Sequence, residues 1–180
     1  MKIYKLDIDV NKYKGCYISK SKLTQDDFDK INNGEVLNFD EGCTSFKYAE
    51  DEELELGDVI YCWDFGGIMI NNKVCNVLSK NEGVKIQYVK LQDNFNLLNN
   101  LLVIDALDNE KTEYKYFEKD IIGVKKYAFK DIEYPPLFQT ILPDGYVDMK
   151  YFVTDEFIKF VNDNNIKGFL FEEVWDSKKN

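Results

Sequence analysis

The sequence contains no histidine, and none of its four cysteines belongs to a Cys-x-x-Cys pair. Without histidine, nucleophile pairs of the Ser–His and Cys–His kinds are excluded, and so is a catalytic zinc site of the histidine-rich type. Four scattered thiolates would have to converge to hold a structural zinc ion. We therefore expect no metal, no disulfide and no cofactor, and instead reduced, partly buried thiols. The four cysteines are Cys16, Cys43, Cys62 and Cys75.

Long apolar runs and net positive charge are missing as well. No apolar stretch approaches the ~18 residues of a membrane-spanning helix. Residues 1–7 alternate polar and apolar side chains and lack the apolar core of a signal peptide, so we expect an opening strand and a cytoplasmic location. The net charge of −10 repels nucleic acid and anionic membranes. It suits a cationic partner, although solubility alone is the alternative explanation.

The length and composition allow a sizeable core. With 180 residues and a hydrophobic fraction of 44%, the chain fits one domain over 1–180, with possible lobes at 1–92 and 93–180. Short strand-like runs separated by turns clearly outnumber helical patterns. The sequence therefore predicts an α+β fold with mixed, mostly antiparallel sheets and a few short helices.

The last thirty residues have the pattern of a strand, a helix and a second strand. The helix has a cap that can accept from a free backbone N–H, an apolar face at i, i+3 and i+4, and a terminus that tolerates left-handed backbone. We expect Phe160 on that face to be almost fully buried. In order, the residues that carry the pattern are Thr154, then Phe157, Phe160 and Val161, then Asn164 and Asn165.

The same pattern occurs earlier in the chain at a constant spacing, with Asn71 in place of Thr154. Strand–helix–strand is a common unit, so chance is the alternative. A structural repeat is favoured because cap, apolar face and second strand all keep register, and two copies are too few for a solenoid. The matching positions are Val74, Val77 and Leu78 on the helix face, and Ile86 and Tyr88 in the second strand.

Elsewhere the chain shows one more helix and several strands. Thr24 is suited to cap a short helix that continues through Ile31. Pro135–Pro136 predicts an extended entry into the strand that begins at Leu137. Further strands are expected at 12–19, 36–39, 59–64, 102–107, 112–117 and 123–129.

Residues 40–58 are strongly acidic. We interpret this segment as a contact surface for a basic partner. The alternative is a solvated loop, since blocks of like charge are often simply exposed. The candidate contact residues are Glu50, Asp51, Glu52, Glu53, Glu55 and Asp58.

Catalytic constellations are hard to find in this sequence. Asp105 and Asp108 bracket a strand end, where a hydrolase could place an acid and a base. With 33 acidic residues, such pairs are also expected by chance. The Gly66–Gly67 pair lacks the lysine and the spacing of a phosphate-binding loop. We therefore expect a protein that is not an enzyme.

Three segments taken together resemble a known family. They are the run from Val103 to Phe117, the pair Leu137–Phe138, and the run from Phe152 to Phe171. Their order is similar to that in immunity-protein family eleven of bacterial polymorphic toxin systems, which was first catalogued as a domain of unknown function. The likeness covers roughly 68–175, and more weakly the opening strand.

The resemblance implies a cytoplasmic protein that binds and neutralises a cognate toxin domain, often encoded beside it. It implies no catalytic residues and does not identify the toxin. A basic toxin domain would agree with the acidic composition. Two alternatives stay open: a small hydrolase-like enzyme that uses Asp105 and Asp108, and a protein-binding scaffold domain unrelated to toxins.

Overall fold

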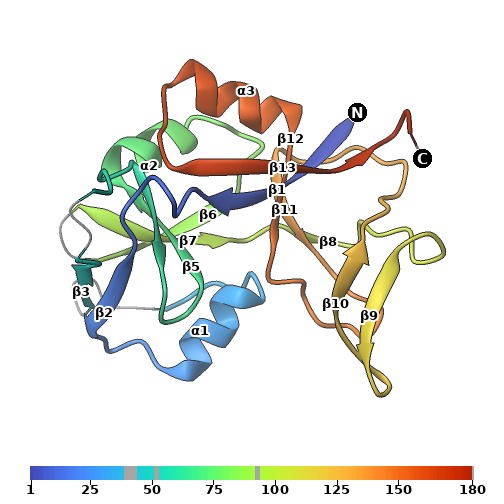
Figure 1. Cartoon of the computed structure of the whole chain (residues 1–180), viewed down its shortest axis with the longest axis horizontal. Helices are drawn as coiled ribbons and strands as arrows, with labels where there is room; N and C mark the ends of the chain where they lie inside the picture. The colour runs from blue at the N-terminus through green and yellow to red at the C-terminus, as the bar shows by residue number, and fades with distance from the viewer. Residues whose placement is uncertain (39–43, 51–52, 92–93, 180) are drawn as a thin grey trace.

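The computed structural model describes residues 1–38, 44–50, 53–91 and 94–179 (Figure 1). Within these ranges the chain forms three helices and thirteen strands, so the predicted α+β class with mostly antiparallel sheets is confirmed. No helix in the described ranges is long and apolar enough to cross a bilayer. The helices are α1 (Gln25–Asn32), α2 (Asn72–Leu78) and α3 (Asp155–Asp163).

The strands form two larger sheets and one hairpin. The six-stranded sheet contains β2 (Cys16–Lys20), β3 (Ser45–Tyr48), β4 (Val59–Cys62), β5 (Gly67–Asn71), β6 (Ile86–Lys90) and β7 (Phe95–Asn100), in the order β3-β2-β4-β5-β7-β6. The five-stranded sheet contains β1 (Lys2–Ile8), β8 (Val103–Ile104), β11 (Leu137–Thr140), β12 (Tyr151–Thr154) and β13 (Phe169–Asp176), in the order β13-β1-β12-β11-β8. The hairpin pairs β9 (Glu113–Phe117) with β10 (Asp120–Lys126).

The predicted repeat is present as two strand–helix–strand units, β5-α2-β6 and β12-α3-β13. In each unit a third, antiparallel strand lies between the two strands: β7 between β5 and β6, and β1 between β12 and β13. The helix faces also correspond. On α2 both Val74 and Leu78 are fully buried, and on α3 Phe157 is fully buried and Val161 almost so.

Two details of the repeat differ from expectation. Phe160 is only half-buried, like its counterpart Val77, because both lie at the margin of an apolar face whose centre is Phe157 or Val74. The Thr154 side chain makes no cap hydrogen bond, although its backbone is extended as a cap requires. Asn71 does cap its helix, because its side-chain oxygen accepts from the Val74 N–H at 3.0 Å.

Several strand boundaries also differ. The strand expected at 123–129 is found three residues earlier, as β10. No strand includes Val36, Leu37 or Asn38, and Phe39 lies outside the described residues. The strand expected at 102–107 is reduced to β8, and the strand expected at 12–19 begins at Cys16. Conversely, β7 was not expected, because three asparagines interrupt its apolar pattern. All six residues of β7 are buried, and Asn96, Asn99 and Asn100 donate side-chain hydrogen bonds there.

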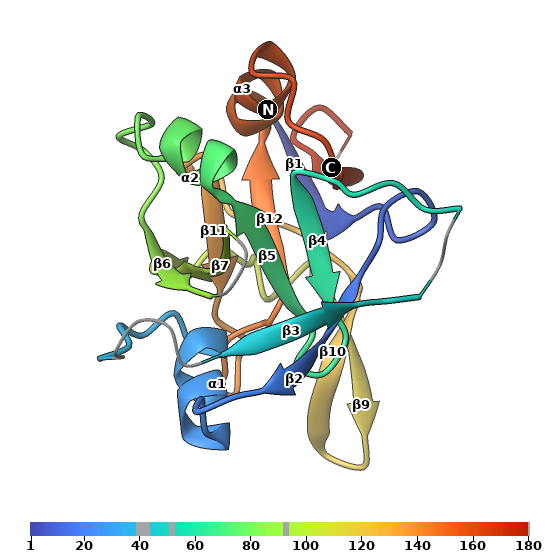
Figure 2. The same cartoon turned by 90° about the vertical axis from the view of Figure 1, so that its left-hand side faces the viewer.

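The core joins the two large sheets. One apolar cluster takes Ile70 and Val74 from the first unit and Val153, Phe157 and Val161 from the second. Figures 1 and 2 show α2 and α3 on the same side of the molecule, above the strands of their units. A second cluster lies under α1, and an aromatic third cluster supports the hairpin β9–β10.

Candidate partner-binding surface

The acidic segment is exposed where the structure describes it. Glu50, Glu53 and Glu55 all have exposed side chains, whereas Asp51 and Glu52 lie outside the described residues, as do Asp40 and Glu41. The backbone of Glu55 is held on the turn before β2, since its N–H donates to Lys12 O at 3.1 Å and its carbonyl accepts from Lys14 N at 2.9 Å. A fixed backbone therefore presents part of this acidic segment to solvent.

Asp58 differs from the other candidate contact residues because its carboxylate is used inside the protein. It accepts from Lys73 Nζ at 2.9 Å, from Asn71 Nδ2 at 3.0 Å and from the Lys167 N–H at 3.0 Å. Burial alone would raise the pKa of Asp58. The three hydrogen bonds outweigh burial and hold the pKa below its ordinary value. Asp58 thus connects the first unit to the loop before β13.

Replacing Asp58 by asparagine is expected to lower the free energy of unfolding at pH 7 by about 1.5–3 kcal/mol, the range for hydrogen bonds to a charged group. The folded-state pKa is depressed, so this contribution is complete above the unfolded pKa of about 3.9 and is lost as the pH falls through the folded pKa. Urea unfolding at pH 7 and at pH 3 measures the difference.

Asp26→Asn is the matched control for Asp58. Asp26 forms an ion pair with Lys30 within α1, and its side chain is 78% exposed. The control should change stability by less than about 0.5 kcal/mol. Equal effects of the two substitutions at pH 7, or a difference between parent and Asp58→Asn that does not shrink from pH 7 to pH 3, would contradict the role given to Asp58.

An exposed tryptophan lies beside the acidic segment. The backbone N–H of Trp63 donates to the Cys16 carbonyl at 3.0 Å, and the Asp64 carboxylate accepts from the backbone N–H of Ile18. Trp63 therefore lies next to Tyr17 of β2. Tyr17 is 50% exposed and Trp63 is 44% exposed.

Glycine at position 15 is required by the tryptophan. A Cβ there would lie 2.3 Å from Trp63 Nε1, so any larger residue would displace the indole from the turn. The Gly15 carbonyl accepts from the Ala49 N–H at 2.9 Å, so Glu50 directly follows a residue that is bonded to this turn. Tyr61 packs edge-on against Trp63 from the other side, with ring centroids 4.9 Å apart.

We call this exposed aromatic pair, together with the exposed glutamates of the adjoining acidic segment, the Trp63 face. It lies on β2, β4 and the segments that flank them, and Figure 2 shows β2, β3 and β4 side by side. Half-exposed aromatic rings with charged residues around them are typical of the energetic centre and rim of a protein interface. The members are Tyr17, Glu50, Glu53, Glu55 and Trp63.

The two aspartates of the hydrolase alternative are engaged by lysines. Asp105 is 65% exposed and pairs with Lys130 at 2.7 Å, and Asp108 pairs with Lys111 at 2.9 Å. The hydrogen bond from Lys111 holds the pKa of Asp108 below its ordinary value. A general acid requires a raised pKa, so this arrangement does not favour acid–base catalysis at Asp108.

The described cysteines behave as core residues. Cys16 and Cys62 are fully buried and face each other across β2 and β4, and the partly buried Cys75 accepts from Asn96 at 3.2 Å. The hydrogen bond to Cys62 and burial raise the pKa of the Cys16 thiol, so this thiol stays protonated. Cys43 lies outside the described residues. Among the residues that are described, no three histidine, cysteine or acidic side chains gather as metal ligands do.

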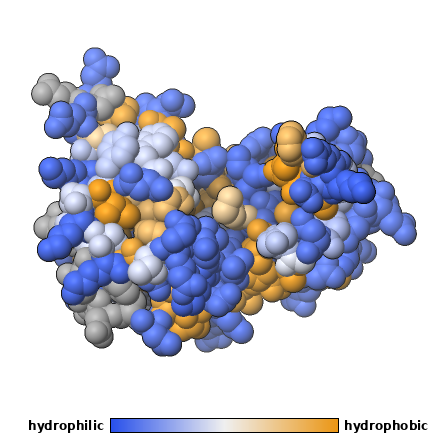
Figure 3. Space-filling view, turned by 90° about the horizontal axis from the view of Figure 1, so that it is seen from below, coloured by the Kyte–Doolittle hydropathy of each residue, from blue (hydrophilic) through white to orange (hydrophobic). Residues whose placement is uncertain are grey.

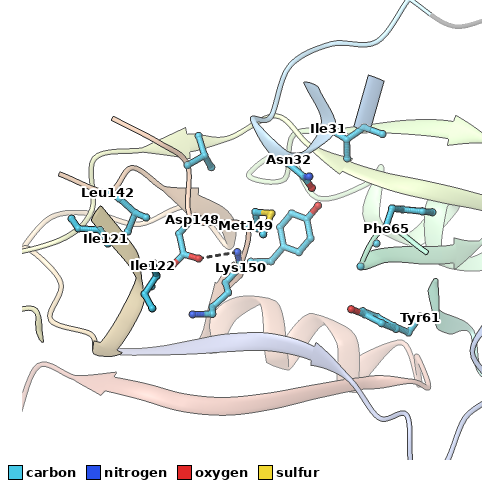
Figure 4. A pocket seen from close by; sticks show the side chains of 15 residues that line it. Ile31, Asn32, Tyr61, Phe65, Ile121, Ile122, Leu142, Asp148, Met149 and Lys150 are labelled. Carbon is cyan, nitrogen blue, oxygen red and sulfur yellow. Dashed lines mark hydrogen bonds between the residues drawn. The ribbon is translucent and has the colours of Figure 1, made fainter. Parts of the chain in front are cut away.

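A cavity of about 430 Å³ opens beside the Trp63 face. Two groups of side chains face each other across it (Figure 4). They are Ile121, Ile122 and Leu142 on one side, and Ile31, Asn32 and Phe65 on the other. Seen from below, hydrophobic surface is exposed at the waist of the molecule, between the part with α1 and the part with the hairpin (Figure 3). Tyr61 lines the cavity and contacts Trp63, so the two features are continuous.

A chain of polar groups forms one end of the cavity. Lys150 Nζ donates to Tyr127 Oη at 2.7 Å, and Tyr127 Oη donates to Asp148 Oδ2 at 2.7 Å. The Lys150 N–H donates to Asp148 Oδ1 at 3.2 Å (Figure 4). Burial, followed by the charge of Asp148, raises the pKa of Tyr127, so the phenol stays neutral. The charges of Asp148 and Lys150 therefore compensate each other inside the protein.

Sequence reasoning missed the cavity and the position of Trp63. The cavity is assembled from α1, the β4–β5 turn, β10 and the β11–β12 connection, and no local pattern indicates that these segments meet. The one usable signal is the tryptophan itself, because tryptophan is large and rarely fully buried.

No protein-family model matches the chain, and no curated protein matches it in sequence.

Proposed function

We propose that this chain is a cytoplasmic immunity protein that binds and neutralises a cognate toxin domain of a polymorphic toxin system, without catalysis. The observation that carries the proposal is the Trp63 face, an exposed aromatic centre bordered by acidic side chains. Its chemistry suits a partner with basic residues around an apolar or aromatic contact. The net charge of −10 would steer such a partner toward the protein.

The hydrolase alternative has weaker support, because lysines engage both of its aspartates. A scaffold domain that binds an unrelated partner would use the same kind of surface. Gene neighbourhood separates these two: the immunity function expects a large secreted protein with a variable C-terminal domain encoded immediately upstream. That C-terminal domain is then the partner to test.

The acidic border is tested by replacing Glu50, Glu53 and Glu55 together with glutamine. Rim charges act mainly on association, so we expect association with the toxin domain to slow by about tenfold at low salt, and its salt dependence to flatten. Dissociation should change little. Stopped-flow or surface binding at low and moderate salt measures both rates.

The matched control replaces Glu110, Glu118 and Glu133, which are also exposed, with glutamine. This variant has the same net charge as the test variant but leaves the Trp63 face intact. If both variants associate equally slowly, net charge alone steers the partner. If the test variant associates as fast as the parent at both salts, the acidic segment is only a solvated loop.

A further inference from the structure

We propose that the cavity between α1 and β10 is a binding site for a small, uncharged, mostly apolar molecule that carries one hydrogen-bond-accepting oxygen. This site adjoins the Trp63 face through Tyr61, but it does not depend on the immunity function. Its volume of about 430 Å³ falls within the range of small-molecule pockets, which are mostly apolar with a few convergent polar groups.

The apolar part of the ligand is indicated by the walls. Ile121, Leu142 and Phe65 are half-buried and line the space between the hairpin and the end of α1. At the opening, Ile122 is 63% exposed and Met149 is 68% exposed. An unbranched thioether adapts to different shapes, so Met149 suits the entrance of an apolar site.

The accepting oxygen is indicated by Tyr151. This residue lines the cavity, its exposed fraction is 8%, and its hydroxyl forms no hydrogen bond with any described residue. A phenol that lines a cavity without a protein partner is free to pair with a ligand oxygen or with water. Burial raises the pKa of Tyr151, so the group is a neutral phenol that can donate.

Two more polar groups line the same space without a protein partner. Neither the Tyr61 hydroxyl nor the Asn32 side-chain amide forms a hydrogen bond within the described ranges, and both residues line the cavity. Phenol and amide N–H groups both donate to a carbonyl oxygen. Three such groups from β4, α1 and β12 therefore favour a ligand with an accepting oxygen over a pure hydrocarbon.

A charged ligand is disfavoured by the end wall. The Asp148 carboxylate accepts from Tyr127 and from the Lys150 backbone, and Lys150 Nζ donates to Tyr127. The two charged side chains of the cavity thus compensate each other through the phenol. No net charge is left to offset the desolvation of an ionised ligand.

The test uses two probes of nearly the same shape, acetophenone and ethylbenzene, titrated into the full chain and followed by amide NMR. Acetophenone should shift the amides of 121–123 and 147–149. Tyr151→Phe should weaken acetophenone binding by roughly five- to tenfold, the effect of one hydrogen bond, and leave ethylbenzene binding within about twofold.

Tyr146→Phe, which alters a 72% exposed tyrosine outside the cavity lining, should change the binding of neither probe. Leu142→Trp should abolish binding of both probes by filling the space.

Three results would overturn the proposal. In the first, neither probe shifts the cavity amides at millimolar concentration. In the second, Tyr151→Phe binds acetophenone as tightly as the parent does. In the third, the cavity amides shift with protein concentration in the absence of probe, which would show that a second copy of the chain occupies the space. The Tyr151→Phe comparison decides the matter even if Leu142→Trp does not fold.

Discussion

Replacing Phe157 by alanine is expected to lower the free energy of unfolding by about 3–5 kcal/mol, the range for removing a large aromatic side chain from a core. The Phe157 side chain is fully buried. The centroid of its ring lies 5.9 Å from the ring centroid of Phe169 and 6.4 Å from that of Phe171. It belongs to the cluster that both repeat units share. The cavity left by alanine would therefore weaken the contact between the two sheets. Urea unfolding followed by circular dichroism gives the magnitude.

Phe160→Ala is the matched control, because it removes the same side chain from the same helix. Phe160 is only half-buried, so its replacement should cost less than about 2 kcal/mol. Equal losses for the two variants would show that the face of α3 is rotated from the orientation described. A loss under about 1 kcal/mol for Phe157→Ala would place that ring outside the core.

Replacing Trp63 by alanine is expected to weaken binding of the toxin domain by about 2 kcal/mol or more, which corresponds to roughly thirtyfold in Kd. The indole is held against Gly15 and Tyr61, so little side-chain entropy would be lost when a partner covers it. The loss should appear mainly as faster dissociation, in contrast to the glutamate variants. Surface binding gives both rates.

Tyr146→Ala serves as the control for Trp63, since Tyr146 is 72% exposed and lies outside the Trp63 face. It should leave the affinity unchanged. Circular dichroism and the unfolding midpoint must show that Trp63→Ala still folds. If a folded Trp63→Ala binds the toxin domain as tightly as the parent, the Trp63 face is not the contact surface.

The helices could be predicted because each combines several local signals. In α1, Thr24 and Asp27 form a capping box, and in both repeat helices the apolar positions recur with the helical period. Local signals of this kind do not depend on which tertiary contacts the helix makes. The end of α3 also followed expectation, since Asn165 adopts a left-handed backbone with φ of 49°.

What could not be predicted depends on contacts between distant segments. Strand β7 could not be predicted because its asparagines are buried. They are hydrogen-bonded to residues such as Gln87 and Asn72, and no pattern in the sequence identifies these partners. In the sequence Asp58 resembles the neighbouring surface carboxylates, but in the structure it accepts a hydrogen bond from the distant Lys167 backbone. Of the six candidate contact residues, three are exposed, Asp58 is half-buried and hydrogen-bonded within the protein, and Asp51 and Glu52 lie outside the described residues.

The position of β1 has a consequence for the order of folding during synthesis. β1 occupies in the second unit the place that β7 occupies in the first, but β7 directly follows its unit whereas β1 precedes every other described strand. On the ribosome, the first unit can close as soon as β7 emerges. β1 cannot pair until β12 and β13 have been synthesised, when Ile3 can pair with Thr154 and Trp175. Until then both edges of β1 are unpaired, and an unpaired strand is a template for aggregation. The pairing of β1 with β12 and β13 joins the residues that are farthest apart in the sequence, so it should be the slow step of folding.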